Sequence, residues 1–240
     1  MRRFELLVFD WDGTLMDSEA RIVACLQGAI SDLSLPHREV SALRNIIGLG
    51  LAEAVETLFP GSDAATLQAV VERYRHHFLV ADPTPSTLFE GAAETLYALA
   101  AEGYLLAVAT GKGRRGLDKV LEETGLGPLF HATRCADETC SKPHPQMLLE
   151  LMDHLGAEPQ ATLMIGDTEY DMEMARNAHT AALGVSYGVH HPERLLRHEP
   201  LGCLDRIGDL PAWLNAKDDI QDSKFKVERQ KQADQSFAES

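Results

Sequence analysis

Two aspartates near the start of the chain, Asp10 and Asp12, have the type and spacing to act on a phosphate or to bind a metal ion. They follow the apolar run of residues 6–8, which predicts a short buried strand. Side chains two residues apart on extended backbone point to one face, so both carboxylates can face the same ion or phosphate. Gly13 lets the chain turn and Thr14 adds a hydroxyl. Ligands bind at the carboxyl ends of strands in open α/β sheets, so we expect a catalytic edge here rather than a plain acidic turn.

A second acidic pair, Asp167 and Asp171, follows the apolar run of residues 161–165. We expect both carboxylates on one face of a helix that begins there. Acidic residues at a helix start also favour the helix dipole, which is the simpler explanation of the pair. Because an apolar strand leading into Gly-Asp repeats the N-terminal pattern, we favour metal binding. Oxygen ligands without histidine suit Mg²⁺ better than zinc.

Two further segments suit a phosphate group. Thr110 and Gly111 end the predicted strand of residues 105–109 at a helix start, where a hydroxyl and backbone amides can bind phosphate. A threonine that caps the helix explains the same residues equally well. Lys142 precedes another predicted helix, with Pro143 near its first position. A lone lysine is usually a solvated surface charge, but between acidic groups it can neutralise a nucleophilic carboxylate and a phosphate.

The elements that must position these residues alternate from residue 89 onward. Apolar periodicity predicts helices over residues 92–101, 114–123, 145–155 and 169–178. Strands are predicted over residues 105–109, near 132–133, and over 161–165 and 180–185. This alternation predicts an α/β fold, a doubly wound parallel sheet with helices on both faces. We expect residues 1–16 and 87–214 to form this core.

Residues 17–86 are predicted to form an all-helical insert in that core. Helical spacing recurs over residues 22–33, 51–59 and 67–78, and the proline-rich residues 82–86 indicate a stiff connector. The glycine-rich segment of residues 44–50 is equally consistent with a substrate-facing loop and with an ordinary turn between helices. The polar residues 215–240 predict a flexible C-terminal tail.

The composition limits the partners. The 240 residues carry a formal net charge of −15, with 45% hydrophobic and 25% charged residues. This balance excludes nucleic acid and anionic membrane as main partners, and an anionic substrate then needs a bound cation and local basic groups. The four cysteines form no C-x-x-C pair, no run reaches transmembrane length, and the N-terminal residues lead into a strand rather than a signal peptide. We expect a cytoplasmic protein, either a monomer or a homodimer.

Taken together, the motifs resemble those of the haloacid dehalogenase superfamily. The matching residues occur in order as Asp10-x-Asp12-Gly13-Thr14, then Thr110, then Lys142 in Ser-Lys-Pro, then Gly166-Asp167-x-x-x-Asp171. The resemblance covers residues 1 to about 214 and is closest to the phosphoglycolate phosphatase group, partly through residues 109–118. It implies a Rossmann-like core, a small helical cap, and a phosphatase that acts on a small phosphate ester.

By this resemblance, Asp10 is the nucleophile that forms an aspartyl-phosphate, and Asp12 is the general acid and base. The resemblance implies that Mg²⁺ is bound by the Asp10 side chain, the Asp12 backbone carbonyl and Asp167. It implies that Asp171 supports this shell or holds Lys142. The phosphoryl oxygens are expected to contact Thr110, the Gly111 amide and Lys142.

Several alternatives stay open. Dehalogenases of the superfamily lack an aspartate at the position of Asp12, and phosphonate-cleaving relatives need a cap lysine, whereas no lysine precedes Lys112. A β-phosphoglucomutase-like phosphotransferase shares the core machinery and would need cap arginines, for which the candidates are Arg21, Arg44, Arg73 and Arg75. A non-catalytic phosphate sensor is the candidate from another functional class. Among substrates, 2-phosphoglycolate is the first expectation, and a sugar phosphate such as an amino-sugar 6-phosphate is the alternative.

Overall fold

The computed structural model describes residues 2–216, so nearly all of the expected tail, residues 217–240, lies outside the described residues. Within them, six parallel strands form one sheet in the order β5-β4-β1-β6-β7-β8. The strands of this sheet are β1 (Leu6–Phe9), β4 (Leu105–Thr110), β5 (Ala132–Cys135), β6 (Thr162–Gly166), β7 (Ala181–Val185) and β8 (Cys203–Leu204). The central position of β1, between β4 and β6, brings the three motif-bearing strands side by side.

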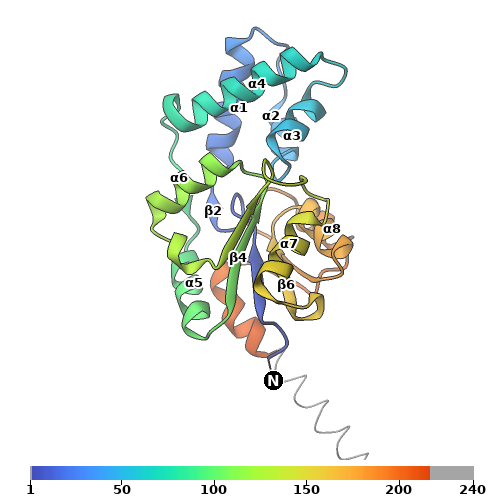
Figure 1. Ribbon diagram of the computed structural model, residues 1–240. Helices are drawn as coiled ribbons and strands as arrows, with labels where there is room; N and C mark the ends of the chain where they lie inside the picture. Colours follow the sequence, from blue (N-terminus) through green and yellow to red (C-terminus); the bar gives the residue numbers. More distant parts are fainter. Residues whose placement is uncertain (1, 217–240) are drawn as a thin grey trace, which may run out of the picture.

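Helices cover both faces of the sheet (Figure 1). They are α5 (Ala92–Ala101), α6 (Arg114–Thr124), α7 (Gln146–Leu155), α8 (Glu169–Asn177) and α9 (Pro192–Leu196), with short 3₁₀ turns η2 (Gly127–Leu129), η3 (Pro159–Ala161) and η4 (Ile207–Asp209). On β1, Leu7 and Phe9 face a core that α5 and α6 complete, whereas Leu6 and Val8 face a second core with α7, α8 and α9. Side chains alternate along a strand, so a sheet buried on both faces needs apolar residues at successive positions.

The segment of residues 17–86, here called the helical insert, lies at one end of the molecule (Figure 1). It contains α1 (Glu19–Asp32), α2 (Val40–Asn45), α3 (Leu51–Leu58), α4 (Ala64–His76) and the π-helical turn η1 (His77–Ala81). Most buried side chains of these helices pack in an apolar core of their own, whereas Cys25 and Phe78 join one of the two cores of the sheet. A two-stranded antiparallel ribbon, β2 (Met16–Asp17) with β3 (Thr87–Leu88), joins the points where the chain enters and leaves the insert.

The doubly wound α/β fold expected from the sequence is confirmed, and several details differ. The ribbon β2–β3, the six-residue helix α2, and α9 and β8 were not predicted, because elements this short show no hydrophobic period. Helix α7 begins at Gln146, so Pro143 precedes the helix instead of opening it. A turn takes its place, in which the His144 amide donates to the Ser141 carbonyl (3.0 Å) after a cis Lys142–Pro143 peptide.

No helix among the described residues is both long enough and apolar enough to cross a bilayer.

Candidate active site

Three carboxylates meet where β1 and β6 end. Ligand atoms of Asp10, Asp167 and Asp171 lie within 4.8 Å of one another, and all three side chains are buried. Lys142 is buried beside them, with its Nζ 2.9 Å from Asp10 Oδ1 and 2.6 Å from Asp171 Oδ1. The structure therefore brings together four side chains from three separate segments, all of which the sequence had singled out.

The crowding of negative charge changes how these groups ionise. Burial, together with Asp171 and Asp12, raises the pKa of Asp10 to about 7, against the lowering effect of Lys142. Burial and the neighbouring aspartates raise the pKa of Asp167 well above its usual range. Burial alone would lower the pKa of Lys142, but its two carboxylate partners hold it above the ordinary value. One lysine does not balance three buried carboxylates, so the cluster favours a further cation.

The donor set fits a magnesium ion. Asp10 Oδ2 is buried and has no hydrogen-bond partner among residues 2–216, so one carboxylate oxygen has its lone pairs free. The oxygens of Asp167 accept hydrogen bonds from Thr14 Oγ1 and from the Val189 amide, both at 2.8 Å, which fixes the orientation of this carboxylate. All available donors are oxygens, as Mg²⁺ prefers. The residues present therefore fit the ion that the sequence suggested.

Asp171 contributes to both the charge cluster and the local fold. Its Oδ2 accepts hydrogen bonds from the Thr168 amide (3.0 Å) and hydroxyl (2.7 Å), a capping box at the start of α8. Its other oxygen, Oδ1, faces Lys142. The expectation that Asp167 and Asp171 share a helix face is wrong, because Thr168 caps the helix and leaves Asp167 on the preceding extended segment.

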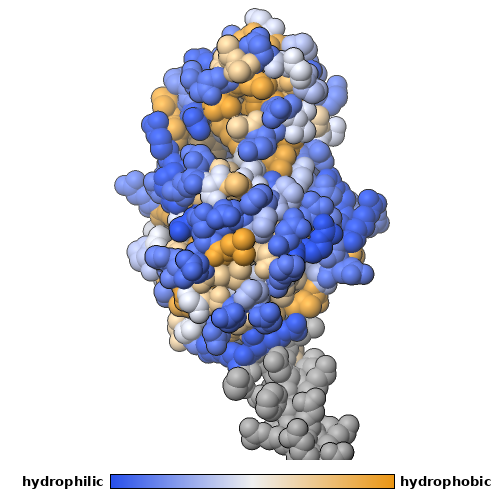
Figure 2. Space-filling model, turned by 45° about the vertical axis from the view of Figure 1, so that its right-hand side comes forward, coloured by the Kyte–Doolittle hydropathy of each residue, from blue (hydrophilic) through white to orange (hydrophobic). Residues whose placement is uncertain are grey.

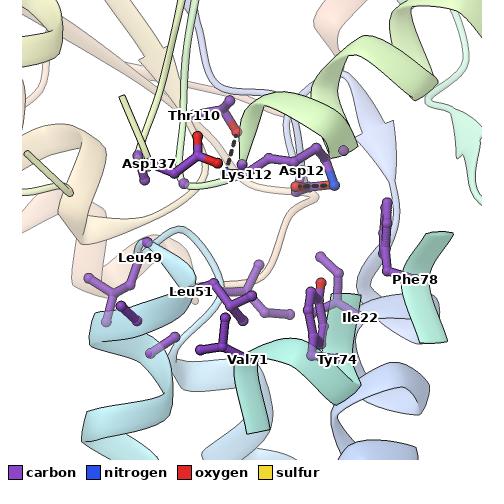
Figure 3. A pocket seen from close by; sticks show the side chains of 18 of the residues that line it. Asp12, Ile22, Leu49, Leu51, Val71, Tyr74, Phe78, Thr110, Lys112 and Asp137 are labelled. Atoms are coloured by element: carbon purple, nitrogen blue, oxygen red, sulfur yellow. Dashed lines mark hydrogen bonds and ion pairs between the residues drawn. The ribbon is translucent and has the colours of Figure 1, made fainter. Parts of the chain in front are cut away.

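Asp12 lines the same cavity as Asp10 but is not part of the cluster of Asp10, Asp167 and Asp171. Its Oδ1 accepts a hydrogen bond from Ser18 Oγ (2.6 Å), and its Oδ2 lies 2.9 Å from Lys112 Nζ. Lys112 also lies over the ring of Phe78, 4.2 Å from its centroid, and Figure 3 shows the ion pair on the core side of a pocket. Ser18 and Lys112 were missed as functional residues, although Lys112 stands directly after the Thr110-Gly111 motif.

The segment after β4 lies beside these groups. Thr110 is buried, and its Oγ1 accepts a hydrogen bond from the Lys112 amide (3.2 Å). Helix α6 starts only at Arg114 with Gly113 as its N-cap, so the helix-capping interpretation of Thr110 is wrong. A Cβ at Gly111 would overlap the carbonyl oxygens of Gly48 and Leu49, which shows how closely the insert approaches this segment.

A cavity of about 380 Å³ separates the sheet from the helical insert. Asp10, Asp12, Thr110 and Lys112 line it on the core side, and the helices of the insert line the opposite side (Figure 3). Residues 46–50 also line the cavity, and the Gly50 amide donates a hydrogen bond to Ser141 Oγ (2.7 Å) on the core.

Residues 44–50 were equally consistent with a substrate-facing loop and with a turn between helices, and their first residues do not line the cavity. Arg44 belongs to α2 and pairs with Glu19 (3.0 Å). Arg21 donates to the Phe78 carbonyl and Arg73 pairs with Asp32, so of the four insert arginines weighed for a second phosphate only Arg75 lines the cavity. Among the insert arginines, Arg75 alone is then placed to hold a second phosphate group in this cavity.

Replacing Gly13 with alanine is expected to disturb the metal site as well as the fold. Gly13 has φ +84°, and an added Cβ would overlap the Asp167 carboxylate. Gly61→Ala is the matched control, because Gly61 has φ +79° with nothing near its Cβ. We expect Gly61→Ala to lose about 1–2 kcal/mol of unfolding free energy with activity retained, and Gly13→Ala to lose more and to weaken Mg²⁺ binding. Urea unfolding measures the free energy of unfolding, and a metal titration measures Mg²⁺ affinity. Equal effects of the two substitutions would contradict the close approach of Gly13 to the Asp167 carboxylate.

The chain is similar to known proteins in sequence and in fold. A family model described as haloacid dehalogenase-like hydrolase matches residues 7–185. The chain is 38% identical over 210 residues to "Probable phosphatase IndB" of Dickeya dadantii, covering 85% of this chain and 91% of that protein. It is 32% identical over 198 residues to the N-acetylmuramic acid 6-phosphate phosphatase of Pseudomonas putida, covering 80% and 86%.

A crystal structure of another protein shows that the similarity extends to the fold. The crystal structure of "a predicted phosphoglycolate phosphatase" from Haemophilus somnus matches with a TM-score of 0.78 and 26% identity, covering 88% of this chain and 98% of that one. The matched family segment runs from β1 to the end of β7 and contains all four motif segments. The chain therefore belongs to the haloacid dehalogenase-like hydrolases.

Proposed function

We propose that this protein is a magnesium-dependent phosphatase that hydrolyses phosphate monoesters through an aspartyl-phosphate on Asp10. The observation that carries the proposal is the free, buried Oδ2 of Asp10, beside Lys142 on the core side of a cavity. A carboxylate with an unpartnered oxygen next to a buried cation can attack an electrophilic phosphorus. The names of the relatives, which include phosphatases of two different phosphate esters, agree with this reaction.

In the first step, a carboxylate oxygen of Asp10 forms a bond to phosphorus as the ester P–O bond breaks. Asp12, on the same side of the cavity, gives a proton to the departing alkoxide oxygen. Lys142 and the hydroxyl of Thr110 stabilise the negative charge on the phosphoryl oxygens.

In the second step, water attacks the phosphorus of the aspartyl-phosphate. Asp12, now a carboxylate, takes a proton from this water, so that inorganic phosphate leaves and the Asp10 carboxylate is restored. The contacts of Asp12 with Ser18 and Lys112 hold its carboxylate in one orientation for both proton transfers.

The side chains of Asp10 and Asp167, with the Asp12 carbonyl, would hold Mg²⁺ in this scheme. When bound, the ion screens the repulsion between the anionic substrate and the acidic cluster. In this scheme Asp171 holds Lys142 in place and does not bind the ion, because one of its oxygens pairs with Lys142 and the other caps α8. We propose that residues 17–86 form a cap over a core made of residues 1–16 and 87–214, and that this cap selects the substrate.

The test of the reaction is hydrolysis of p-nitrophenyl phosphate by the purified chain with MgCl₂ and with a chelator. We expect turnover that depends on the metal. A folded protein that releases no nitrophenol and hydrolyses no phosphomonoester from a broad panel would favour the phosphate sensor instead. Labelling with a ³²P-phosphate ester and acid quenching tests the covalent intermediate separately.

Magnesium is expected to raise the melting temperature more at about pH 8 than at about pH 5. The pKa of Asp10 is raised from 3.8 to about 7, mainly by burial. A raised folded-state pKa means that the folded protein holds the extra proton, so this stability is full below pH 3.8 and is lost as the pH rises through about 7. Above that pH a cation can replace the proton. Equal Mg²⁺ shifts in thermal unfolding at both pH values would contradict this competition.

A further inference from the structure

We infer that the substrate is a phosphate monoester whose alcohol carries a bulky apolar body, rather than the carboxylate of 2-phosphoglycolate or the hydroxyls of a sugar phosphate. This inference rests on the proposed function, because it places the phosphoryl group at Asp10 and the rest of the substrate in the cavity above it. The evidence is the chemistry of the cavity wall that faces the catalytic groups.

The side chains that the helical insert contributes to the inner wall of the cavity are apolar except for the hydroxyl of Tyr74. Its side chains in Figure 3 are Ile22, Leu49, Leu51, Val71, Tyr74 and Phe78, which come from α1, α3, α4, η1 and the loop before α3. They face the core-side groups across the cavity. Figure 2 also shows apolar side chains gathered around a hollow on the part of the surface formed by the insert. A ligand body in contact with this wall gains free energy by leaving water only if it is itself apolar.

Apart from the Tyr74 hydroxyl, which points into the cavity, the polar side chains of the insert that line the cavity are at exposed positions. Glu53, Gln68 and Arg75 are all solvent-exposed, whereas Val71 is buried. Lys112, on the core side, is already paired with Asp12. A carboxylate or several hydroxyls placed against the inner wall would lose water and find only the Tyr74 hydroxyl as a side-chain partner there, which costs binding free energy. The wall thus disfavours both substrates expected from the motifs.

The volume of the cavity suits a ring. Cavities of about 150 Å³ accept benzene, so 380 Å³ has room for a phosphoryl group and a ring system. Tyr74 and Phe78 both line the cavity, with ring centroids 6.0 Å apart. Lys112 and Arg21 lie over the Phe78 ring, 4.2 Å and 4.7 Å from its centroid, so the aromatic surface left for a ligand is mainly that of Tyr74. Flat aromatic surfaces pack well against another planar apolar group.

The first experiment compares benzyl phosphate with glucose 6-phosphate and 2-phosphoglycolate, all of which leave as primary alkoxides. We expect kcat/KM for benzyl phosphate to exceed both others by about tenfold or more. A value for either polar ester that equals or exceeds the benzyl value would overturn the inference and leave the proposed phosphatase function standing.

The second experiment tests the wall with one chemical change at two sites. Val71→Thr puts a hydroxyl on the inner wall, and Val80→Thr makes the same change at a residue that is 75% exposed and does not line the cavity. We expect Val71→Thr to raise KM for benzyl phosphate about fivefold and to change KM for glucose 6-phosphate less than about twofold. Val80→Thr should leave KM for both esters at the parent values. If Val71→Thr fails to fold, Leu51→Ser, at a half-buried position, makes the same test.

If the parent shows no turnover, binding measurements still distinguish the proposed phosphatase function from the proposed ligand class. Calorimetry with the Asp10→Asn variant and the same three esters gives their order of affinity without hydrolysis. Preferred binding of benzyl phosphate with no turnover by the parent would overturn the proposed function and retain the ligand class. An unchanged KM for benzyl phosphate in folded Val71→Thr would overturn the inference that this wall contacts the apolar part of the substrate.

Discussion

Asp10→Asn is expected to abolish phosphatase turnover, lowering kcat by about 10⁴-fold or more. Asparagine has nearly the same shape as aspartate but cannot form the acyl-phosphate that the reaction requires. The side chain is 1% exposed and lies beside Asp167 and Asp171, so removing its charge also relieves repulsion in the cluster. We therefore expect a melting temperature equal to or above that of the parent. Steady-state kinetics and thermal unfolding measure the two effects.

Asp153→Asn is the matched control for this variant, because Asp153 is an exposed residue of α7 in the same core. It should leave kcat and the melting temperature at the parent values. Residual turnover of Asp10→Asn within tenfold of the parent would contradict the nucleophile assignment. So would a ³²P label that persists on the acid-quenched variant.

Lys142→Met is expected to have the second-largest effect, on both stability and activity. The ammonium of Lys142 is fully buried between Asp10 and Asp171, and methionine keeps much of its shape without the charge. Removing one partner of a buried ion pair costs about 3–5 kcal/mol, because the carboxylates stay behind uncompensated. We expect a melting temperature lower by about 10 °C and kcat lower by at least about 100-fold.

The pH dependence of Lys142→Met distinguishes loss of charge from loss of packing. With the cation gone, the stability deficit should be larger at about pH 8, where the carboxylates are ionised, than at about pH 5. Adding Asp10→Asn should recover part of the lost stability, since one uncompensated charge is removed. Lys119→Met serves as the control: Lys119 is a partly exposed lysine of α6 that pairs with Glu123 and donates to the Leu79 carbonyl (3.0 Å), so its loss should cost about 1 kcal/mol with no pH dependence of this kind and little change in kcat. A deficit independent of pH would indicate that Lys142 acts through packing alone.

The sequence predicted the chemistry of the core better than the geometry around it. Apolar strands ending in Asp10, Thr110 and Gly166-Asp167 identify the fold, because parallel strands bring their carboxyl ends to one edge. The position of Lys142 could be recognised only through the family resemblance, since an isolated lysine has no pattern of its own. Its contacts with Asp10 and Asp171 appear only in three dimensions.

The surroundings of Asp12 were beyond the reach of sequence patterns. Ser18 and Lys112 are 94 residues apart along the chain, and both contact Asp12 because the start of α1 and the segment after β4 approach it in the fold. The cavity wall was missed for a related reason. Val71 and Tyr74 follow a helical period that indicates burial, and the same period describes a core position and a position facing a cavity.

The two oxygens of Asp171 tie the electrostatics of the site to the folding of a helix. One oxygen closes the first turn of α8, and the other holds the ammonium that faces Asp10. A substitution at residue 171 meant to retune reactivity would therefore also loosen the helix start, and a change that frays α8 would shift the charge next to the nucleophile. Attempts to evolve a faster or more promiscuous enzyme should leave this residue alone and vary Leu51 and Val71 on the opposite wall, which take no part in the ion pairs of the site.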